Sequence, residues 1–324
     1  MNYILIIIWL FNLFTYFKPE YYISELALSF LPYILFFCII ITFYNIFTIR
    51  KIIPKDEKKH KKIIRLWNFI LYFLLFVFYS QKYLHFYTFQ WFQASSETGI
   101  NVFYANIYKD NTDFTWLENT IKSKNPDVIM LVEFADLHYQ NLKDYLSENY
   151  PYVNRTSRSQ EFIWSIVFSK IPLENLIENY PQWMRRYWYF SINFQWKKYY
   201  FYLVHTSSPT SYENFKMRNE QLLKLSSDFD LHEKNREIWH NVIMIWDFNI
   251  SPRSEYYKNF YSDLDLQNYT QNAWWLFTRK FKYFPIFWSH IDHIFINSWV
   301  EIWNLKTINI LWSDHRGYSF TISN

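Results

Sequence analysis

The chain has 324 residues, enough for one large domain and a further segment. Its formal net charge is only +4, so no overall basic field predicts a nucleic-acid-binding protein. A single cysteine, Cys38, excludes an internal disulfide, and cysteine usage therefore says nothing about the redox compartment.

The first part of the chain contains three apolar stretches, at residues 3–17, 26–49 and 63–79. The second is uncharged and long enough to cross a bilayer core of about 30 Å. The first is short enough for a signal-peptide core, but no basic residue precedes it and no small-residue cleavage site follows, which favours a retained helix. Hydrophobic helices of a soluble core are the alternative. We predict three transmembrane helices within residues 1–85.

A basic loop at residues 50–65, RKIIPKDEKKHKKIIR, separates the second and third stretches. Short basic loops stay on the cytoplasmic side, so everything after about residue 85 is expected outside the cytoplasm. The sequence thus predicts a multi-pass cell-membrane protein with an extracytoplasmic domain and the lipid bilayer as its partner. The loop either orients the chain only or also binds anionic lipid headgroups. No obligate protein partner is evident.

Residues 86–100 resemble a linker, and residues 101–324 are expected to form the soluble domain. Its apolar runs predict strands at 101–106, 127–132, 162–168, 187–194, 198–204, 242–246, 291–296 and 305–311. Helical periodicity predicts helices at 113–124, 137–148 and 212–229. Strands that alternate with helices indicate an α/β domain.

Polar residues stand at the ends of several predicted strands: Asn106, Glu133, His205, Asp247, Asn249, Asp292, Asp314 and His315. Alternation along a strand places Asp247 and Asn249 on one side of the chain. Each ending by itself is equally consistent with an ordinary turn. Together they suggest strand ends that converge on one rim, where α/β proteins tend to place their sites.

Five segments, NPDVIMLVE, LVHTSSP, IMIWDFN, IDHIF and WSDHRGY, follow one another in the chain. In this order they resemble the endonuclease/exonuclease/phosphatase superfamily, which includes deoxyribonuclease I, exonuclease III and neutral sphingomyelinases. The resemblance spans roughly residues 100–322. It implies two packed β-sheets flanked by helices, a four-layer sandwich, and hydrolysis of phosphoric esters with Mg²⁺ or Mn²⁺.

The resemblance also implies roles for individual residues. Glu133 matches the main metal ligand, Asn106 the asparagine beside it, and Asp314 a carboxylate that approaches the metal. Mg²⁺ prefers such oxygen ligands.

The catalytic residues implied by the resemblance are His205, Asp247, Asn249, Asp292 and His315. Asp247 would position the attacking water or take its proton, and Asn249 would donate to a phosphate oxygen. Asp292 would pair with His315, because a carboxylate beside an imidazole favours its charged form, and His205 would contact the scissile phosphate. A zinc site at His290, Asp292 and His293 is disfavoured, because alternation points His293 away from the other two. Arg218 is expected on a solvated helix face.

The substrate is left open between a lipid headgroup or lipid-linked phosphate and nucleic acid. The membrane tether favours the first, and the layout of three helices before the domain resembles superfamily members of the teicoplanin-resistance type. A catalytically inactive binding module on the same fold is the alternative, against which the complete set of acids and histidines argues.

Tryptophan is abundant and glycine is scarce, with 16 Trp and 2 Gly. Trp164, Trp246, Trp288 and Trp312 stand where the resemblance leads us to expect glycine, which suits tight turns and close backbone approach. We predict that the UGA codon, here written as tryptophan, is read as glycine in the source organism, as it is in some bacterial lineages. A natural aromatic-rich chain or an inactive homologue is the alternative.

Overall fold

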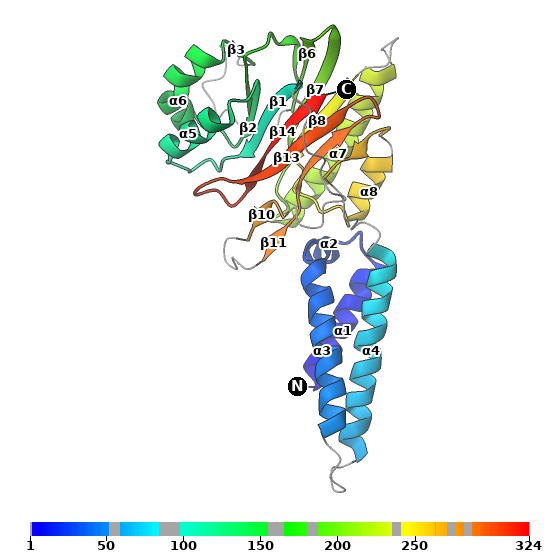
Figure 1. The fold of residues 1–324 in the computed structure, drawn as a ribbon. Coiled ribbons are helices and arrows are strands. Elements are labelled where there is room, and N and C mark those ends of the chain that lie inside the picture. The colour runs from blue at the N-terminus through cyan, green and yellow to red at the C-terminus, as the bar shows by residue number, and fades with distance from the viewer. Residues whose placement is uncertain are drawn as a thin grey trace. The chain divides into compact units, whose positions relative to one another are not determined.

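The computed structural model describes residues 2–51, 59–83, 98–154, 165–179, 187–234, 241–262, 264–270, 277–281 and 287–323 (Figure 1). It divides into two compact units. One comprises Met1–Thr88 with Ser251–Tyr257, and the other comprises Phe89–Ile250 with Lys258–Asn324. Residues 52–58 of the basic 50–65 loop and residues 86–97 of the predicted linker lie outside the described residues, and the rest of the predicted loop belongs to the ends of two helices.

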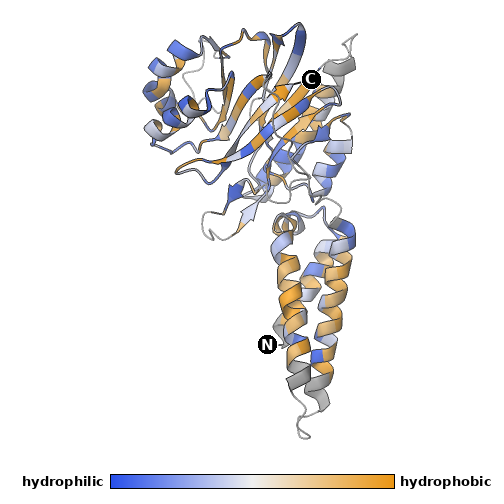
Figure 2. Ribbon diagram, viewed as in Figure 1, coloured by the Kyte–Doolittle hydropathy of each residue, from blue (hydrophilic) through white to orange (hydrophobic). Residues whose placement is uncertain are grey.

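The first unit is helical. Its helices are α1 (Asn2–Phe17), α2 (Tyr22–Ser29), α3 (Leu31–Lys51) and α4 (Lys59–Tyr83). Figure 2 shows that apolar residues dominate α1, α3 and α4. Tyrosines tie α4 to α1, because Tyr72 donates to the carbonyl of Leu5 over 2.6 Å and Tyr79 donates to that of Asn12 over 2.8 Å. These bonds satisfy hydroxyls that apolar packing would otherwise leave without a partner.

One of the three predicted membrane stretches, residues 26–49, does not form a continuous helix. The stretch 26–49 is broken between α2 and α3, which meet at a bend of 74°. Pro32 in the first turn of α3 explains the break, because proline fits a helix start but has no backbone donor to continue a preceding helix. Residues 63–82 of α4 are long and apolar enough to cross a membrane. The bent pair of α2 and α3 is long enough only if both helices are counted as one broken span. The described helices therefore offer one span, or two if the bent pair counts.

The second unit is built on two six-stranded mixed sheets. The first sheet has the order β13-β14-β1-β2-β4-β3. Its strands are β1 (Ile100–Asn106), β2 (Val128–Val132), β3 (Tyr152–Val153), β4 (Ser165–Ser169), β13 (Glu301–Asn309) and β14 (Arg316–Ser323). Strands β1 and β2 run parallel. Helices α5 (Phe114–Lys124) and α6 (Asp136–Asn149) pack on its outer face, where Leu117, Ile121 and Leu142 are buried.

The second sheet has the order β5-β6-β7-β8-β12-β9. Its strands are β5 (Glu174–Asn179), β6 (Tyr187–Phe194), β7 (Lys197–His205), β8 (Asn241–Asp247), β9 (Gln267–Asn268) and β12 (Asp292–Ile296). Helices α7 (Tyr212–Lys234) and α8 (Glu255–Ser262) accompany it, and the rings of Phe229 and Phe260 contact Tyr202 and Phe295 of the sheet. A small hairpin, β10 (Arg279–Lys280) and β11 (Trp288–Ser289), forms a separate two-stranded sheet.

The main hydrophobic core lies between the two sheets. Val102, Tyr104 and Met130 of the first sheet join Phe201 and Ile245 of the second in one buried cluster. Helix, sheet, sheet and helix thus form successive layers, and the predicted α/β fold with two packed sheets is confirmed (Figure 1). The predicted strand 305–311 is wrong at its end, because β13 stops at Asn309 and a turn carries Leu311 and Trp312.

Two tryptophans occupy left-handed backbone conformations. Trp196 has φ 67° and Trp312 has φ 62°. Trp196 follows Gln195, with φ 48°, in the two-residue turn between β6 and β7. Such a turn needs positive φ at both residues and favours glycine at the second. A bulky side chain at positive φ is a genuine outlier, which agrees with the prediction that some of the written tryptophans are glycines.

Candidate active site

Strand pairing in the second sheet aligns three of the predicted site residues. Parallel pairing of β7 and β8 sets His205 beside Asp247, and antiparallel pairing of β8 and β12 sets Asp292 on the other side of Asp247. The three side chains are almost completely buried. Asp247 therefore lies between a histidine and a second carboxyl group because of strand register alone.

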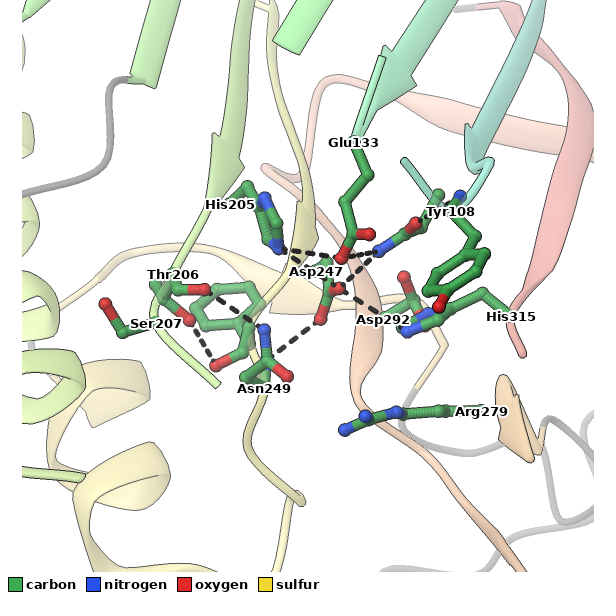
Figure 3. A network of polar contacts seen from close by, with 12 residues as sticks. Tyr108, Glu133, His205, Thr206, Ser207, Asp247, Asn249, Arg279, Asp292 and His315 are labelled. Carbon is green, nitrogen blue, oxygen red and sulfur yellow. Dashed lines mark hydrogen bonds and ion pairs between the residues drawn. The ribbon is translucent and has the colours of Figure 1, made fainter. Parts of the chain in front are cut away.

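The first sheet supplies Asn106 and Glu133 from the ends of the parallel strands β1 and β2. The Asn106 amide nitrogen donates to Glu133 Oε1 over 3.1 Å and to Asp247 Oδ2 over 3.0 Å. The amide oxygen of Asn106 accepts from the backbone of Tyr108. One asparagine thus bridges carboxylates that belong to different sheets, and Figure 3 shows Glu133, His205 and Asp247 facing one another.

A buried aspartate and histidine form the other side of the cluster. Asp292 Oδ2 lies 3.0 Å from His315 Nδ1, and Asp292 Oδ1 accepts from the Tyr104 hydroxyl over 2.9 Å. The opposite ring nitrogen of His315, Nε2, is 3.7 Å from Asp247 Oδ2. Asp292 therefore orients the imidazole so that its far nitrogen faces Asp247.

Burial and neighbouring charges shift the protonation of this cluster. Burial by itself would lower the pKa of His315, but the negative charges of Asp292 and Asp247 overcome it and raise that pKa to about 9. Burial, followed by repulsion from Asp292, raises the pKa of Asp247 to about 7. At neutral pH the cluster therefore pairs an imidazolium with a carboxyl group that is ready to take up or release a proton.

The donor set fits a divalent cation. Potential ligand atoms of Asp247, Asp292 and His315 lie within 4.8 Å of one another, but a protonated His315 has no lone pair to offer, which leaves the carboxylates as donors. On the other side of Asp247, Glu133 adds a second carboxylate that is partly exposed, with His205 Nε2 only 3.8 Å from its Oε1. Several carboxylate oxygens with one side open to solvent suit Mg²⁺, which prefers oxygen ligands and retains water.

Asn249 is held by the chain around it. It has φ 48°, its backbone N–H donates to Asp247 Oδ1 over 3.1 Å, and its amide nitrogen donates to the carbonyl of Thr206 over 3.1 Å. Arg218 donates to the Asn249 carbonyl over 2.9 Å. Arg218 is completely buried, so its expected place on a solvated helix face is wrong. It lies behind the turn that carries Asp247 and Asn249.

A family model described as Endonuclease/Exonuclease/phosphatase family matches residues 103–315, which include the whole cluster. The chain belongs to this family. The resemblance inferred from five short motifs is thereby confirmed, as is the class of fold. Members of the family are hydrolases of phosphoric esters, such as nucleases and phosphatases, and they usually use divalent metals.

Solved structures agree on the fold. TDP2 from D. rerio, complexed with a single-strand DNA product, has a TM-score of 0.58 at 16% identity, covering 70% of this chain and 100% of that chain. The human Nocturnin catalytic domain has a TM-score of 0.53 at 15% identity, covering 69% and 94%. The mannosyl-6-phosphatase of Bacteroides thetaiotaomicron has a TM-score of 0.50 at 14% identity, covering 69% and 100%. No curated protein sequence matches the chain.

Asp314, the remaining predicted metal ligand, pairs with an arginine instead of the other site carboxylates. Its Oδ2 accepts from Arg279 Nε over 3.2 Å, and it is not among the three residues whose ligand atoms converge. Arg279 stands next to the cluster but follows no recognisable strand pattern, so the sequence offered no signal for it. Tyr108, labelled among the site residues in Figure 3, is a second residue for which the sequence offered no signal.

The two histidines that flank Asp292 have neighbours that alternation did not predict. His290 lies before β12 rather than in it, and its ring centroid is 4.5 Å from that of His293. His293 reaches the carbonyl of Ile250 and the amide of Asn268. The expectation that His290 shares a strand face with Asp292 was wrong, whereas His293 does contact partners other than Asp292, and no candidate metal cluster of the described residues contains either histidine.

Proposed function

We propose that this chain is a membrane-anchored, divalent-cation-dependent hydrolase of phosphoric esters whose active site lies outside the cytoplasm. The observation that carries the proposal is the position of Asp247. It is buried between the Asp292–His315 pair on one side and the Asn106–Glu133 pair on the other.

The residues of the cluster divide the chemistry between them. Asp247, with its pKa raised to about 7, takes the proton of the attacking water as the new P–O bond forms and the bond to the leaving group breaks. His315, kept charged by Asp292, stabilises the negative charge that develops on the phosphoryl oxygens. His205, 3.6 Å from Asp247, lines the same space.

Glu133 would hold the cation beside Asp247, and Asn106 keeps the oxygens of these two carboxylates together. A divalent ion such as Mg²⁺ or Mn²⁺ supplies Lewis-acid stabilisation of the phosphate charge. Asn106 then has the separate task of preventing the two carboxylates from moving apart by repulsion.

Surface exposure in the helical unit supports the membrane anchor. Only 22% of the apolar window of α4 is buried within the unit. Large apolar side chains of α3, including Phe36, Phe43 and Phe47, are more than half exposed. Water-exposed apolar surface of this extent is unfavourable, whereas lipid would cover it. A reporter fused after residue 324 should be active only outside the cytoplasm; cytoplasmic activity would refute the orientation.

The substrate we propose is a lipid headgroup or a lipid-linked phosphate, with nucleic acid second. The membrane anchor favours the first, and the DNA product in the TDP2 complex makes the second worth testing. The decisive experiment measures hydrolysis with Mg²⁺ of phospholipids, an isoprenyl pyrophosphate, and single- and double-stranded DNA. For one of these substrate classes we expect hydrolysis that EDTA abolishes and added Mg²⁺ restores. Binding without hydrolysis of any of them would indicate an inactive binding module.

A further inference from the structure

The hairpin β10–β11 is joined to the segment that carries the catalytic histidine. Arg279 forms an isolated β-bridge with His315. The backbone N–H of Lys280 donates to the carbonyl of Asp314 over 2.6 Å, and that of Arg316 donates to the carbonyl of Thr278 over 2.7 Å. Backbone bonds on both sides of Arg279 therefore hold it beside the active-site histidine.

Thr278 ties the same hairpin to Asp292. Its buried hydroxyl oxygen accepts from the backbone N–H groups of Ile291 and Asp292, over 3.0 and 3.1 Å. Arg279 directly follows Thr278. The backbone of Arg279 is thus held next to Asp292 and His315, the two residues that form the charged pair of the site.

The Arg279 side chain extends into the site rather than away from it. Figure 3 shows it running past the Asp292–His315 pair, with the guanidinium group directed toward the side where Asn249 lies. Asp314 holds Nε over 3.2 Å, and the side chain is 31% exposed. Among the described residues, the guanidinium is held by this bond from Nε to Asp314, which leaves its two terminal nitrogens to donate to a ligand.

We propose that Arg279 is a substrate-binding residue that donates through its terminal nitrogens to a non-bridging oxygen of the substrate phosphate, with Asp314 as its positioning carboxylate. This inference rests on the proposed hydrolysis of phosphoric esters. A guanidinium presents parallel N–H groups that match phosphate geometry. Held at Nε by a carboxylate, it meets the phosphate already oriented and loses little conformational entropy on binding.

Steady-state kinetics with the full-length chain in detergent tests the assignment. Arg279→Gln should raise KM on the order of 10-fold, in line with the loss of a hydrogen bond to a charged group, while kcat stays within about threefold. Arg279→Lys keeps the positive charge but not the parallel N–H groups of the guanidinium, so a smaller rise in KM is expected. Asp314→Asn should raise KM by about threefold, because the guanidinium is still present but no longer held.

Arg316→Gln is the matched control. Arg316 is the neighbouring arginine on β14, where its Nε donates to Asn309 and its guanidinium lies over the Trp288 ring, 4.3 Å from the centroid. Its loss removes one positive charge without removing a contact to the cluster. KM should remain within about twofold of wild type.

Binding of inorganic phosphate, measured by titration calorimetry with Mg²⁺, gives a readout that does not need turnover. The Kd should be weaker by on the order of 10-fold in Arg279→Gln and unchanged in Arg316→Gln. Unchanged KM and Kd in Arg279→Gln, with a lowered Tm, would reduce Arg279–Asp314 to a structural ion pair and overturn the inference. Wild-type protein that hydrolyses nothing would refute the proposed function, while the phosphate titration would still decide the role of Arg279.

Discussion

The centre and the rim of the active site differ in how strongly the chain holds them. In the centre, the side chains of Asp247, Asp292 and His315 are at most 4% exposed and contact one another. On the rim, Glu133, Asp314 and Arg279 are 20%, 27% and 31% exposed. A buried charge that loses its partner is costly, whereas an exposed one is screened by water. The centre is thus built for proton and charge handling, and the rim for binding.

The largest effects are expected in the centre. Asp247→Asn and His315→Ala should each lower kcat by on the order of 10² or more, because both act on charge that develops in the transition state. Asp228→Asn is a matched control, since Asp228 is also buried but accepts from Tyr187 away from the site. Near-normal kcat in both centre variants would refute the assignment.

The next largest effect concerns the rim carboxylate. Glu133→Gln removes a charged oxygen donor that stays partly open to solvent, so the Mg²⁺ concentration for half-maximal activity should rise about 10- to 100-fold. Excess Mg²⁺ should restore most of kcat, which distinguishes this variant from those of the centre. A loss of kcat that no Mg²⁺ concentration relieves would place Glu133 functionally with the centre.

The pair in the centre also predicts a pH dependence. Because the pKa of His315 is raised to about 9, the imidazolium persists at neutral pH and activity should decline only as pH rises through about 9. Asp292→Asn removes the charge that holds this proton, so the decline should move to lower pH, and kcat at pH 8 should fall by about 10-fold. A pH–rate profile checks both, and an unchanged alkaline limb would argue against His315 as the titrating group.

The smallest effects are expected at the strained turns. Trp196→Gly and Trp312→Gly should each stabilise the chain by about 1 kcal/mol, since glycine adopts positive φ without strain. Trp188→Gly is the control and should destabilise, because Trp188 is buried in β6. Thermal unfolding measures all three.

Peptide mass spectrometry tests the prediction that UGA is read as glycine. Peptides from the native organism that span residues 242–253 and 305–316 should carry glycine at positions 246 and 312. Tryptophan at both positions in mass spectra would end that hypothesis. Trp164 lies outside the described residues and outside both peptides, whereas position 246 is decided by the first peptide.

The sequence by itself determined the family, the layered α/β fold and the residues that meet in the cluster. The family and the layered fold were implied by the resemblance of five motifs in order. Strand endings alone follow from local patterns: an apolar strand buried on both faces ends where its first polar residue appears, and Asp247 and His205 are such endings. Among the four tryptophans that the sequence placed at glycine-like turns, Trp312 does have positive φ, while Trp196, which also has it, was not singled out.

Only the tertiary structure decided the neighbours of the long and charged side chains. Arg218 reads as an exposed helix residue, yet it is buried against the carbonyl of Asn249. Arg279 and Asp314 are 35 positions apart and meet because a two-stranded hairpin pairs its backbone with the His315 segment. Periodicity reports which face of an element is apolar, but not which distant element covers it. Contacts between remote segments follow from packing, and for that reason Arg279 and its pairing with Asp314 were invisible in the sequence, although Glu133 and Asp314 themselves were predicted.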